Sequence, residues 1–138
     1  VEQLRTVACV DERAEKSAEA FLPGALTMVM KRQADLPEYM TNGWETIGVR
    51  MPDDAFVLAL IAGCGAPMLV SSANRSGEAT GTTFEEVMRQ LDGRIDGIVK
   101  GTCGCMSAST IIDLSQDEVI VLREGPITKA QIEEALAR

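Results

Sequence analysis

The sequence predicts an α/β fold in which helices pack on a twisted, mixed β-sheet. Segments with helical patterns alternate with short apolar segments typical of strands, but without a strict strand–helix–strand order. Two strand-like segments also follow one another near the C-terminus, as in antiparallel pairs. The chain has 138 residues, 46% of them hydrophobic and 25% charged, which is the size and composition of one globular domain.

The first third of the chain predicts a helix, a strand, a short helix with a loop, and a second strand. Residues 11–22 are rich in Ala, Glu and Lys and end at Pro23-Gly24, which favours a helix there. The segments that follow are the strand 25–31, the short helix and loop 34–45, and the strand 46–50.

The middle of the chain predicts a strongly apolar helix over residues 55–65. Asp53 and Asp54 stand where its N-cap is expected, and Gly63 and Gly65 stand where its C-cap is expected. A short apolar segment follows, which predicts a buried strand over residues 67–70.

The last part of the chain predicts two helices and three strands. Thr83 and Glu86 have capping-box spacing, which predicts a helix over residues 83–91. Thr128 and Gln131 have the same spacing at the start of a final helix. The predicted strands between these helices cover residues 97–100, 109–114 and 118–124.

Composition excludes several classes of function. The 21 acidic and 13 basic residues give a net charge of −8, which disfavours general binding to nucleic acids but allows a local basic pocket. The chain has no histidine, so serine–histidine and cysteine–histidine nucleophiles are excluded. No apolar run approaches the ~20 residues of a membrane helix.

The four cysteines lack the paired C-x-x-C spacing of zinc sites. We interpret them as reduced thiols of a cytoplasmic protein. Cys103 and Cys105 are the one closely spaced pair, which could oxidise or bind metal adventitiously.

Polar residues gather where predicted strands end. They include Thr46 to Arg50, the Ser- and Thr-rich loop 71–83, the loop 101–110, and Arg123. Each loop alone is typical of a structural turn, and each arginine could simply extend into solvent. Their common place at strand ends favours a ligand site, because ligands of α/β sheets collect there and a guanidinium group suits a carboxylate or phosphate. Hydroxyls and arginines without a nucleophile–base pair suit the positioning and charge stabilisation of nucleotidyl transfer.

Five motifs, in order, resemble the YrdC-like threonylcarbamoyl-AMP synthases. They are PGALT (23–27), TIGVRMPDD (46–54), PMLVSSANRSGE (67–78), SASTIIDL (107–114) and VLREGPIT (121–128). The Ser-x-Asn element of that family stands here as Ser72-Ala73-Asn74. The resemblance implies a twisted mixed sheet and an enzyme that makes threonylcarbamoyl-AMP and pyrophosphate from L-threonine, bicarbonate and ATP, with Mg²⁺. The product would pass to a tRNA-modifying transferase complex, so tRNA would be an indirect partner.

The resemblance also implies the roles of single residues. Arg50 and Ser109 would hold L-threonine, with the backbone around Val70 helping. The residues implied for ATP are Thr46, Ser72, Asn74, Thr80 and Arg123. No enzyme nucleophile is needed, because the carbamate formed on threonine attacks the α-phosphate, and this agrees with the absence of histidine.

Two motifs that the family carries upstream are not found in this sequence: a threonine before Tyr-Gly-Leu, and Lys-x-Arg. We therefore expect residues 1–138 to be a partial YrdC-like domain, the C-terminal two-thirds, truncated at its N-terminus and weak or inactive as an enzyme. The alternative is a non-catalytic YrdC-like module that binds RNA or a nucleotide. A purely structural subunit is the least favoured interpretation.

Overall fold

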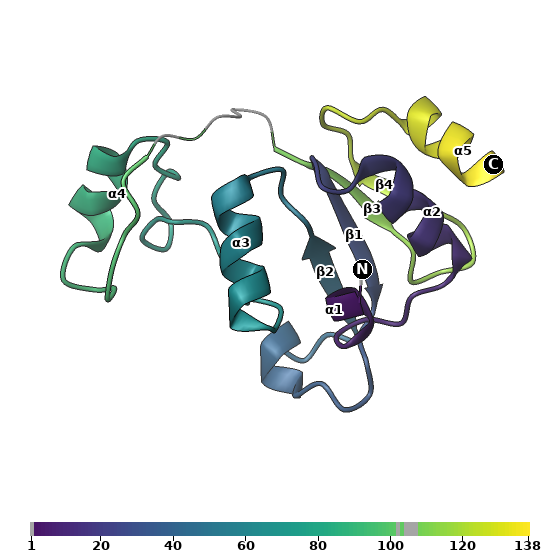
Figure 1. Ribbon diagram of the computed structural model, residues 1–138, viewed down its shortest axis with the longest axis horizontal. Coiled ribbons are helices and arrows are strands. Elements are labelled where there is room, and N and C mark those ends of the chain that lie inside the picture. Colours follow the sequence, from purple (N-terminus) through teal and green to yellow (C-terminus); the bar gives the residue numbers. More distant parts are fainter. Residues whose placement is uncertain (1, 102, 104–107) are drawn as a thin grey trace. The chain divides into compact units, whose positions relative to one another are not determined.

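The computed structural model describes residues 2–101, 103 and 108–138, which form two compact units (Figure 1). Unit 1 comprises Val1–Met68 and Ser107–Arg138, and unit 2 comprises Leu69–Met106. The elements in chain order are α1 (Glu2–Arg5), α2 (Glu12–Phe21), β1 (Leu26–Lys31), the 3₁₀ helix η1 (Glu38–Thr41), β2 (Thr46–Arg50), α3 (Ala55–Cys64), α4 (Phe84–Leu91), β3 (Thr110–Asp113), β4 (Ile120–Arg123) and α5 (Lys129–Ala137).

The four strands form one mixed sheet in unit 1, which confirms the predicted fold class. Their order is β2-β1-β3-β4, with β1 antiparallel to β2, β1 parallel to β3, and β3 antiparallel to β4. β1 and β3 are thus the central strands, and a parallel pair of this kind requires a long crossover between them. That crossover contains β2, α3 and the whole of unit 2.

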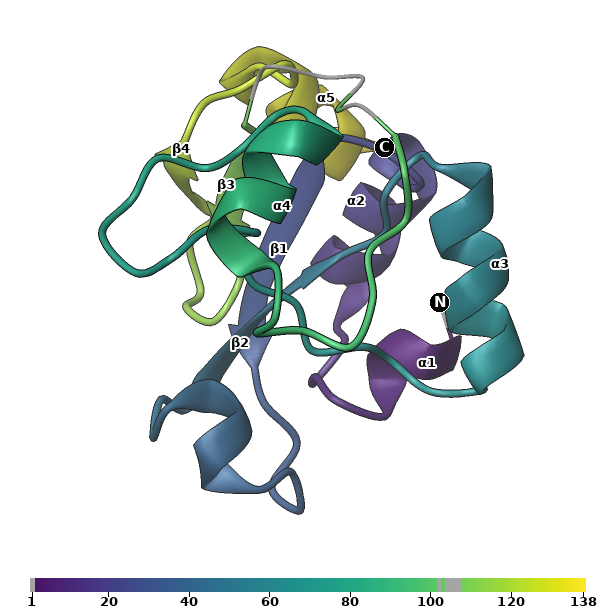
Figure 2. The ribbon, with the colours of Figure 1, turned by 90° about the vertical axis from the view of Figure 1, so that its left-hand side faces the viewer.

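One face of the sheet carries the hydrophobic core of unit 1. Side chains alternate along β1, so that Leu26, Met28 and Met30 are buried while their neighbours are half-buried or exposed. Ala14 and Ala18 of α2 and Ile132 of α5 join the same cluster. The helices α2 and α5 contact each other, as Figures 1 and 2 show, and cover this buried face.

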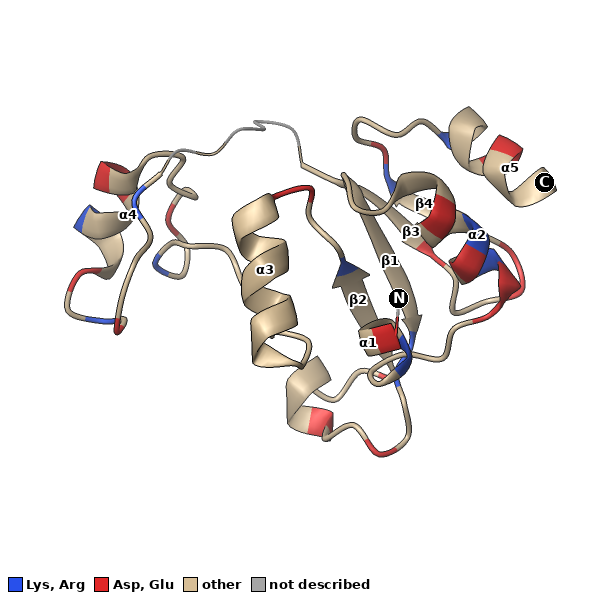
Figure 3. Ribbon diagram, in the orientation of Figure 1, with Lys and Arg blue, Asp and Glu red and all other residues tan. Residues whose placement is uncertain are grey.

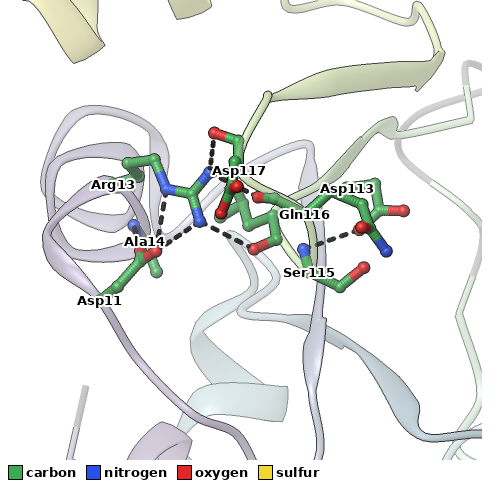
Figure 4. A network of polar contacts seen from close by, with 8 residues as sticks. Asp11, Arg13, Ala14, Asp113, Ser115, Gln116 and Asp117 are labelled. Atoms are coloured by element: carbon green, nitrogen blue, oxygen red, sulfur yellow. Dashed lines mark hydrogen bonds and ion pairs between the residues drawn. The ribbon is translucent and has the colours of Figure 1, made fainter.

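Arg13 ties the start of α2 to the turn between β3 and β4 (Figure 4). Its Nε and Nη2 donate to Asp11 Oδ2 at 2.8 and 2.6 Å. Its Nη1 donates to the carbonyl oxygens of Gln116 and Asp117, both at 2.7 Å, and Nη2 donates to the carbonyl of Leu114 at 3.1 Å. One planar guanidinium group thereby fixes a turn more than a hundred residues away in sequence.

Asp11 is also the N-cap of α2, because its Oδ1 accepts from the Ala14 N–H at 2.9 Å. Partial burial acts to raise the pKa of Asp11, but the Ala14 N–H and the Arg13 guanidinium outweigh it. The pKa of Asp11 therefore lies below its usual value. The carboxylate is consequently charged at neutral pH, as both contacts require.

Helix α3 exposes its apolar side chains, although its sequence suggests a buried helix. Phe56 is 55% exposed and Leu60 43%, and the structure buries no residue of α3. Figure 3 shows the helix without a charged residue. Its predicted N-cap is confirmed at Asp54, whose carboxylate accepts from the Val57 N–H at 2.9 Å, and its C-cap is Gly65 in the left-handed conformation. Gly63, also expected at the C-cap, lies inside the helix.

Two predicted strands are wrong. Residues 67–70 and 97–100 are irregular, and neither segment pairs with a strand in the described part of the chain. Met68, Leu69 and Val70 are exposed by 45%, 72% and 81%, so the expected burial is wrong as well. A short apolar run becomes a strand only where a partner backbone satisfies its N–H and C=O groups.

Unit 2 has one regular element among its described residues, α4, which starts at the predicted capping box. Thr83 Oγ1 accepts from the Glu86 N–H at 3.3 Å, and Glu86 Oε2 accepts from the Thr83 N–H at 3.2 Å. Glu86 Oε2 also accepts from the Thr82 N–H at 2.8 Å and from the Thr82 hydroxyl at 3.2 Å. The end of loop 71–83 is therefore fixed to the first turn of α4.

A capping box also opens α5, at Thr128 and Gln131 as predicted. Helix α1 was not predicted, because residues 1–10 have neither a clear apolar period nor a cap. Among the helices that the structure describes, none combines the length and apolar character needed to cross a bilayer.

Candidate functional site

A row of paired residues crosses the face of the sheet opposite to the core. Thr27 of β1 pairs with Arg50 of β2 on one side and with Ile111 of β3 on the other. Ile111 in turn pairs with Arg123 of β4. Directly paired residues point to the same side of a sheet, so the strand register alone aligns two arginines and a threonine. We call Arg50, Thr27, Ile111 and Arg123 the outer row.

A β-bulge places Arg123 in this row. Ile111 pairs with Arg123 and Ile112 pairs with Val121, so Leu122 is the extra residue and has no partner across the strand. In a regular ladder Leu122 would stand opposite Ile111, and Arg123 would move out of the row. The bulge therefore turns Arg123 to the face that Arg50 and Thr27 share.

Ser109 joins the outer row just before β3 begins. The Arg123 guanidinium donates to the Ser109 carbonyl oxygen from Nε at 3.0 Å and from Nη2 at 2.8 Å, and Nη2 lies 3.4 Å from Ser109 Oγ. Ser109 Oγ is also 2.8 Å from Thr27 Oγ1. Ser109 is only 5% exposed, so its hydroxyl depends on these neighbours for its orientation.

The two arginines of the outer row are not neutralised within the described part of the chain. Neither Arg50 nor Arg123 forms an ion pair there, although every Asp and Glu is among the described residues. Both arginines are exposed. The outer row therefore presents two positively charged groups beside the buried hydroxyl of Ser109, an arrangement suited to a carboxylate or phosphate.

Thr46 lies on the same face as the outer row, at the other end of β2. It pairs with Lys31 of β1, and Gly48 stands between Thr46 and Arg50 with Val29 as its partner. A Cβ atom at Gly48 would meet only the Thr27 methyl group, at 3.7 Å. The missing side chain at Gly48 leaves the surface between Thr46 and Arg50 open.

The other predicted site residues lie in unit 2, where Asn74 organises their loop. Its Nδ2 donates to the carbonyls of Arg75 and Glu78 at 2.9 and 3.1 Å, and its Oδ1 accepts from Thr80 Oγ1 at 3.1 Å. Its backbone N–H donates to the Ser72 carbonyl at 3.1 Å. The structure thus brings Ser72, Asn74 and Thr80 into one exposed loop.

The predicted site residues therefore form one group in each unit. Unit 1 holds the residues Thr46, Arg50, Ser109 and Arg123, and unit 2 holds Val70, Ser72, Asn74 and Thr80. Thr27 was not predicted as a site residue: it ends the PGALT motif, but only the strand register places it between Arg50 and Ile111. Cys105, which the sequence pairs with Cys103, and Ser107, the first residue of the SASTIIDL motif, lie outside the described residues.

A hollow of about 220 Å³ lies between α2 and α5. It is lined by Ala20, Phe21, Gln131, Glu134, Ala135 and Arg138, so it includes no predicted site residue. The outer row is an open surface, and its arginines and hydroxyls make it the stronger candidate.

The mixed sheet and its packed helices define an α/β protein, and solved structures of Sua5 and YciO share its fold. A structure of the Pyrococcus abyssi Sua5 protein in complex with L-threonine matches it with a TM-score of 0.88 and 34% identity, over 97% of this chain and 40% of that one. Escherichia coli YciO matches with a TM-score of 0.78 and 31% identity, over 91% of this chain and 62% of that one.

Sequence comparison identifies the family itself. The family model Sua5_yciO_yrdC, described as Telomere recombination, matches residues 1–125. The chain belongs to the Sua5/YciO/YrdC family. The threonylcarbamoyl-AMP synthase of Bacillus subtilis is 44% identical over 124 residues, which are 88% of this chain and 36% of that protein. Against the other curated relatives compared, the chain spans 40% to 61% of their length.

Proposed function

We propose that this chain binds L-threonine and ATP as part of a threonylcarbamoyl-AMP synthase. The outer row carries this proposal, because its two arginines form no ion pair within the described residues and Arg123 contacts the buried Ser109 beside it. The names of the relatives support it: the B. subtilis protein is a threonylcarbamoyl-AMP synthase, and the P. abyssi Sua5 protein was crystallised with L-threonine.

The roles of the residues follow from their chemistry. In unit 1, the Arg50 guanidinium pairs with the carboxylate of L-threonine and the Ser109 hydroxyl supplies a further hydrogen bond. In unit 2, the backbone around Val70 is also assigned to L-threonine. Arg123 offers positive charge to the phosphates of ATP. The hydroxyl and amide groups of Thr46, Ser72, Asn74 and Thr80 supply further hydrogen bonds to the nucleotide.

The reaction requires no nucleophile from the protein. The amine of L-threonine and bicarbonate form a carbamate with loss of water. A carbamate oxygen then bonds to the α-phosphorus of ATP as the bond to pyrophosphate breaks. Positioning and charge stabilisation are the protein's contribution to such a step. The threonylcarbamoyl-AMP produced would serve the modification of adenosine in tRNA, through a separate transferase.

Magnesium would bind together with ATP. Among the described residues, no group of three or more Cys, Asp or Glu side chains is placed to hold a metal ion. Mg²⁺ commonly binds through substrate phosphates and waters with few protein ligands, so the phosphates of ATP would hold it.

Calorimetric titration of the 138-residue chain tests the proposal. We expect saturable binding of L-threonine, and we expect Arg50→Ala to raise the Kd about tenfold or more, because a charge-assisted hydrogen bond contributes about 1.5–3 kcal/mol. Lys31→Ala is the matched control: it removes the same charge from the same face of the sheet, four cross-strand pairs along the β1–β2 ladder. Equal effects of the two substitutions, or no binding by the parent chain, would contradict the proposal.

A second assay separates synthesis from binding. We expect the chain to form little threonylcarbamoyl-AMP on its own, because its sequence contains no Lys-x-Arg motif. Rapid pyrophosphate release that requires L-threonine and bicarbonate would contradict this expectation. Binding without synthesis would agree equally with the alternative, a nucleotide-binding module.

A further inference from the structure

Thr27 occupies the centre of the outer row without a role of its own. It is the cross-strand neighbour of Arg50, it pairs with Ile111, and its hydroxyl contacts the hydroxyl of Ser109. We propose that Thr27 is a positioning residue for L-threonine binding, which acts by fixing the orientation of the Ser109 hydroxyl. This inference rests on the proposed function and extends it to a residue that the sequence motifs did not single out as part of the site.

The Ser109 hydroxyl needs such a partner. A serine hydroxyl has one donor hydrogen and two acceptor lone pairs, and it rotates freely unless a neighbour holds it. Arg123 fixes the main chain of Ser109 by two hydrogen bonds to its carbonyl oxygen. That interaction leaves the side-chain torsion of Ser109 to be set by Thr27, at 2.8 Å, and by the more distant Arg123 Nη2, at 3.4 Å.

Thr27 is itself held firmly. It lies on a central strand with partners on both sides, and β-branched residues have a restricted first side-chain torsion. Its methyl group faces the space above Gly48, where a Cβ atom, if one were present, would be 3.7 Å away. With the methyl group over Gly48 and the hydroxyl toward Ser109, one rotamer satisfies both contacts.

This arrangement directs the remaining hydrogen-bonding capacity of Ser109. Thr27 takes one of the hydrogen bonds that the Ser109 hydroxyl can make, so the remaining ones point in a fixed direction beside Arg123. A ligand that meets a preorganised donor or acceptor avoids the entropy cost of ordering it. Loss of the Thr27 hydroxyl should therefore weaken threonine binding without removing any direct contact with the ligand.

Two substitutions of the 138-residue chain, compared by calorimetry with L-threonine, test this role. We expect Thr27→Val, which keeps the branched shape and removes the hydroxyl, to raise the Kd about five- to tenfold, the range of one neutral hydrogen bond. Thr27→Ser, which keeps the hydroxyl, should remain within about twofold of the parent. Circular dichroism and thermal unfolding establish that each variant is folded. Thr27→Ala replaces Thr27→Val if the latter is not folded.

A double-mutant cycle with Ser109→Ala distinguishes positioning from general support of the sheet. If Thr27 acts through the Ser109 hydroxyl, Thr27→Val should change the Kd less than about twofold when Ser109 is already alanine. An equal effect of Thr27→Val in both backgrounds, or unchanged binding in the parent background, would overturn the inference while leaving the proposed function intact. No threonine binding by the parent chain would overturn both.

Discussion

Gly125 is packed so closely against the backbone beside Ser109 that no larger residue fits. A Cβ atom there would contact the Ala108 carbonyl oxygen and would lie 2.8 Å from the Thr110 nitrogen. The Gly125 N–H donates to the fully buried Thr110 hydroxyl at 2.9 Å, and the same hydroxyl donates to the Ile127 carbonyl at 2.7 Å. This short segment fixes the chain between Arg123 and α5, and with it the start of β3.

We therefore predict that Gly125→Ala destabilises unit 1 and weakens L-threonine binding. The atoms that the new methyl group meets belong to the backbone, so no rotamer change relieves the contact, and overpacking of this kind costs about 1–3 kcal/mol. Urea unfolding measures the stability and calorimetry measures the binding. Gly97→Ala is the control, because a Cβ atom at Gly97 would have nothing within 4 Å. Parent-like stability of Gly125→Ala would contradict the prediction.

Residues of the site differ in how far the sequence predicts them. Arg50 and Arg123 follow from their motifs and from their places at strand ends. Thr27 does not, because its importance depends on the register that sets it between Arg50 and Ile111. Strand register is a tertiary property, and the bulge at Leu122 that turns Arg123 to the same face is equally hidden from local pattern.

At the scale of elements, the sequence predicts helix caps more reliably than it predicts which segments pair as strands. Both capping boxes and the caps at Asp54 and Gly65 are confirmed, because a cap needs only residues three or four positions apart. The predicted strands 67–70 and 97–100 are wrong, because a strand also needs a partner from elsewhere in the chain. The sheet keeps four of the six predicted strands, and those four suffice for the predicted fold class.

The capping box of α4 predicts a pH dependence of the stability of this helix. Hydrogen bonds from the Thr82 N–H, the Thr83 N–H and the Thr82 hydroxyl hold the pKa of Glu86 below its usual value. A lowered pKa in the folded state means that the carboxylate stabilises α4 fully above the unfolded pKa, near 4.5. This contribution is lost as the pH falls through the folded value.

Glu86→Gln should accordingly speed amide hydrogen exchange in α4 at neutral pH, and the difference from the parent should shrink as the pH falls below about 4. A carbon-detected NMR titration should place the midpoint of Glu86 below the ordinary glutamate value. Glu85→Gln is the matched control, because Glu85 lies in the same first turn and its side chain makes no hydrogen bond within the described residues. A titration midpoint of Glu86 at or above the ordinary value would contradict the prediction.

For the whole molecule, the distribution of charge favours the binding of small anions and disfavours the binding of polyanions. The net charge is −8, and acidic residues lie along α2, α4 and α5 (Figure 3). Arg50 and Arg123 nevertheless lie on one face of the sheet, and neither guanidinium group forms an ion pair within the described residues. A ligand of the size of an amino acid or a nucleotide contacts these groups alone, whereas a long phosphate backbone also meets the acidic surface.

We therefore predict that the chain binds L-threonine and ATP but does not bind free tRNA tightly. Neutralisation of two phosphates by Arg50 and Arg123 would give a slope of about −2 in a plot of log binding constant against log salt concentration. Because the net negative charge repels the phosphate backbone, we expect the Kd for tRNA to exceed about 100 µM at 0.15 M salt. Fluorescence anisotropy with labelled tRNA measures this Kd. Titration of the same sample with ATP controls for the competence of the protein. Micromolar or tighter tRNA binding with a steep salt dependence would contradict the prediction and favour the RNA-binding alternative, because many basic contacts would then have to exist on a surface that this chain makes acidic.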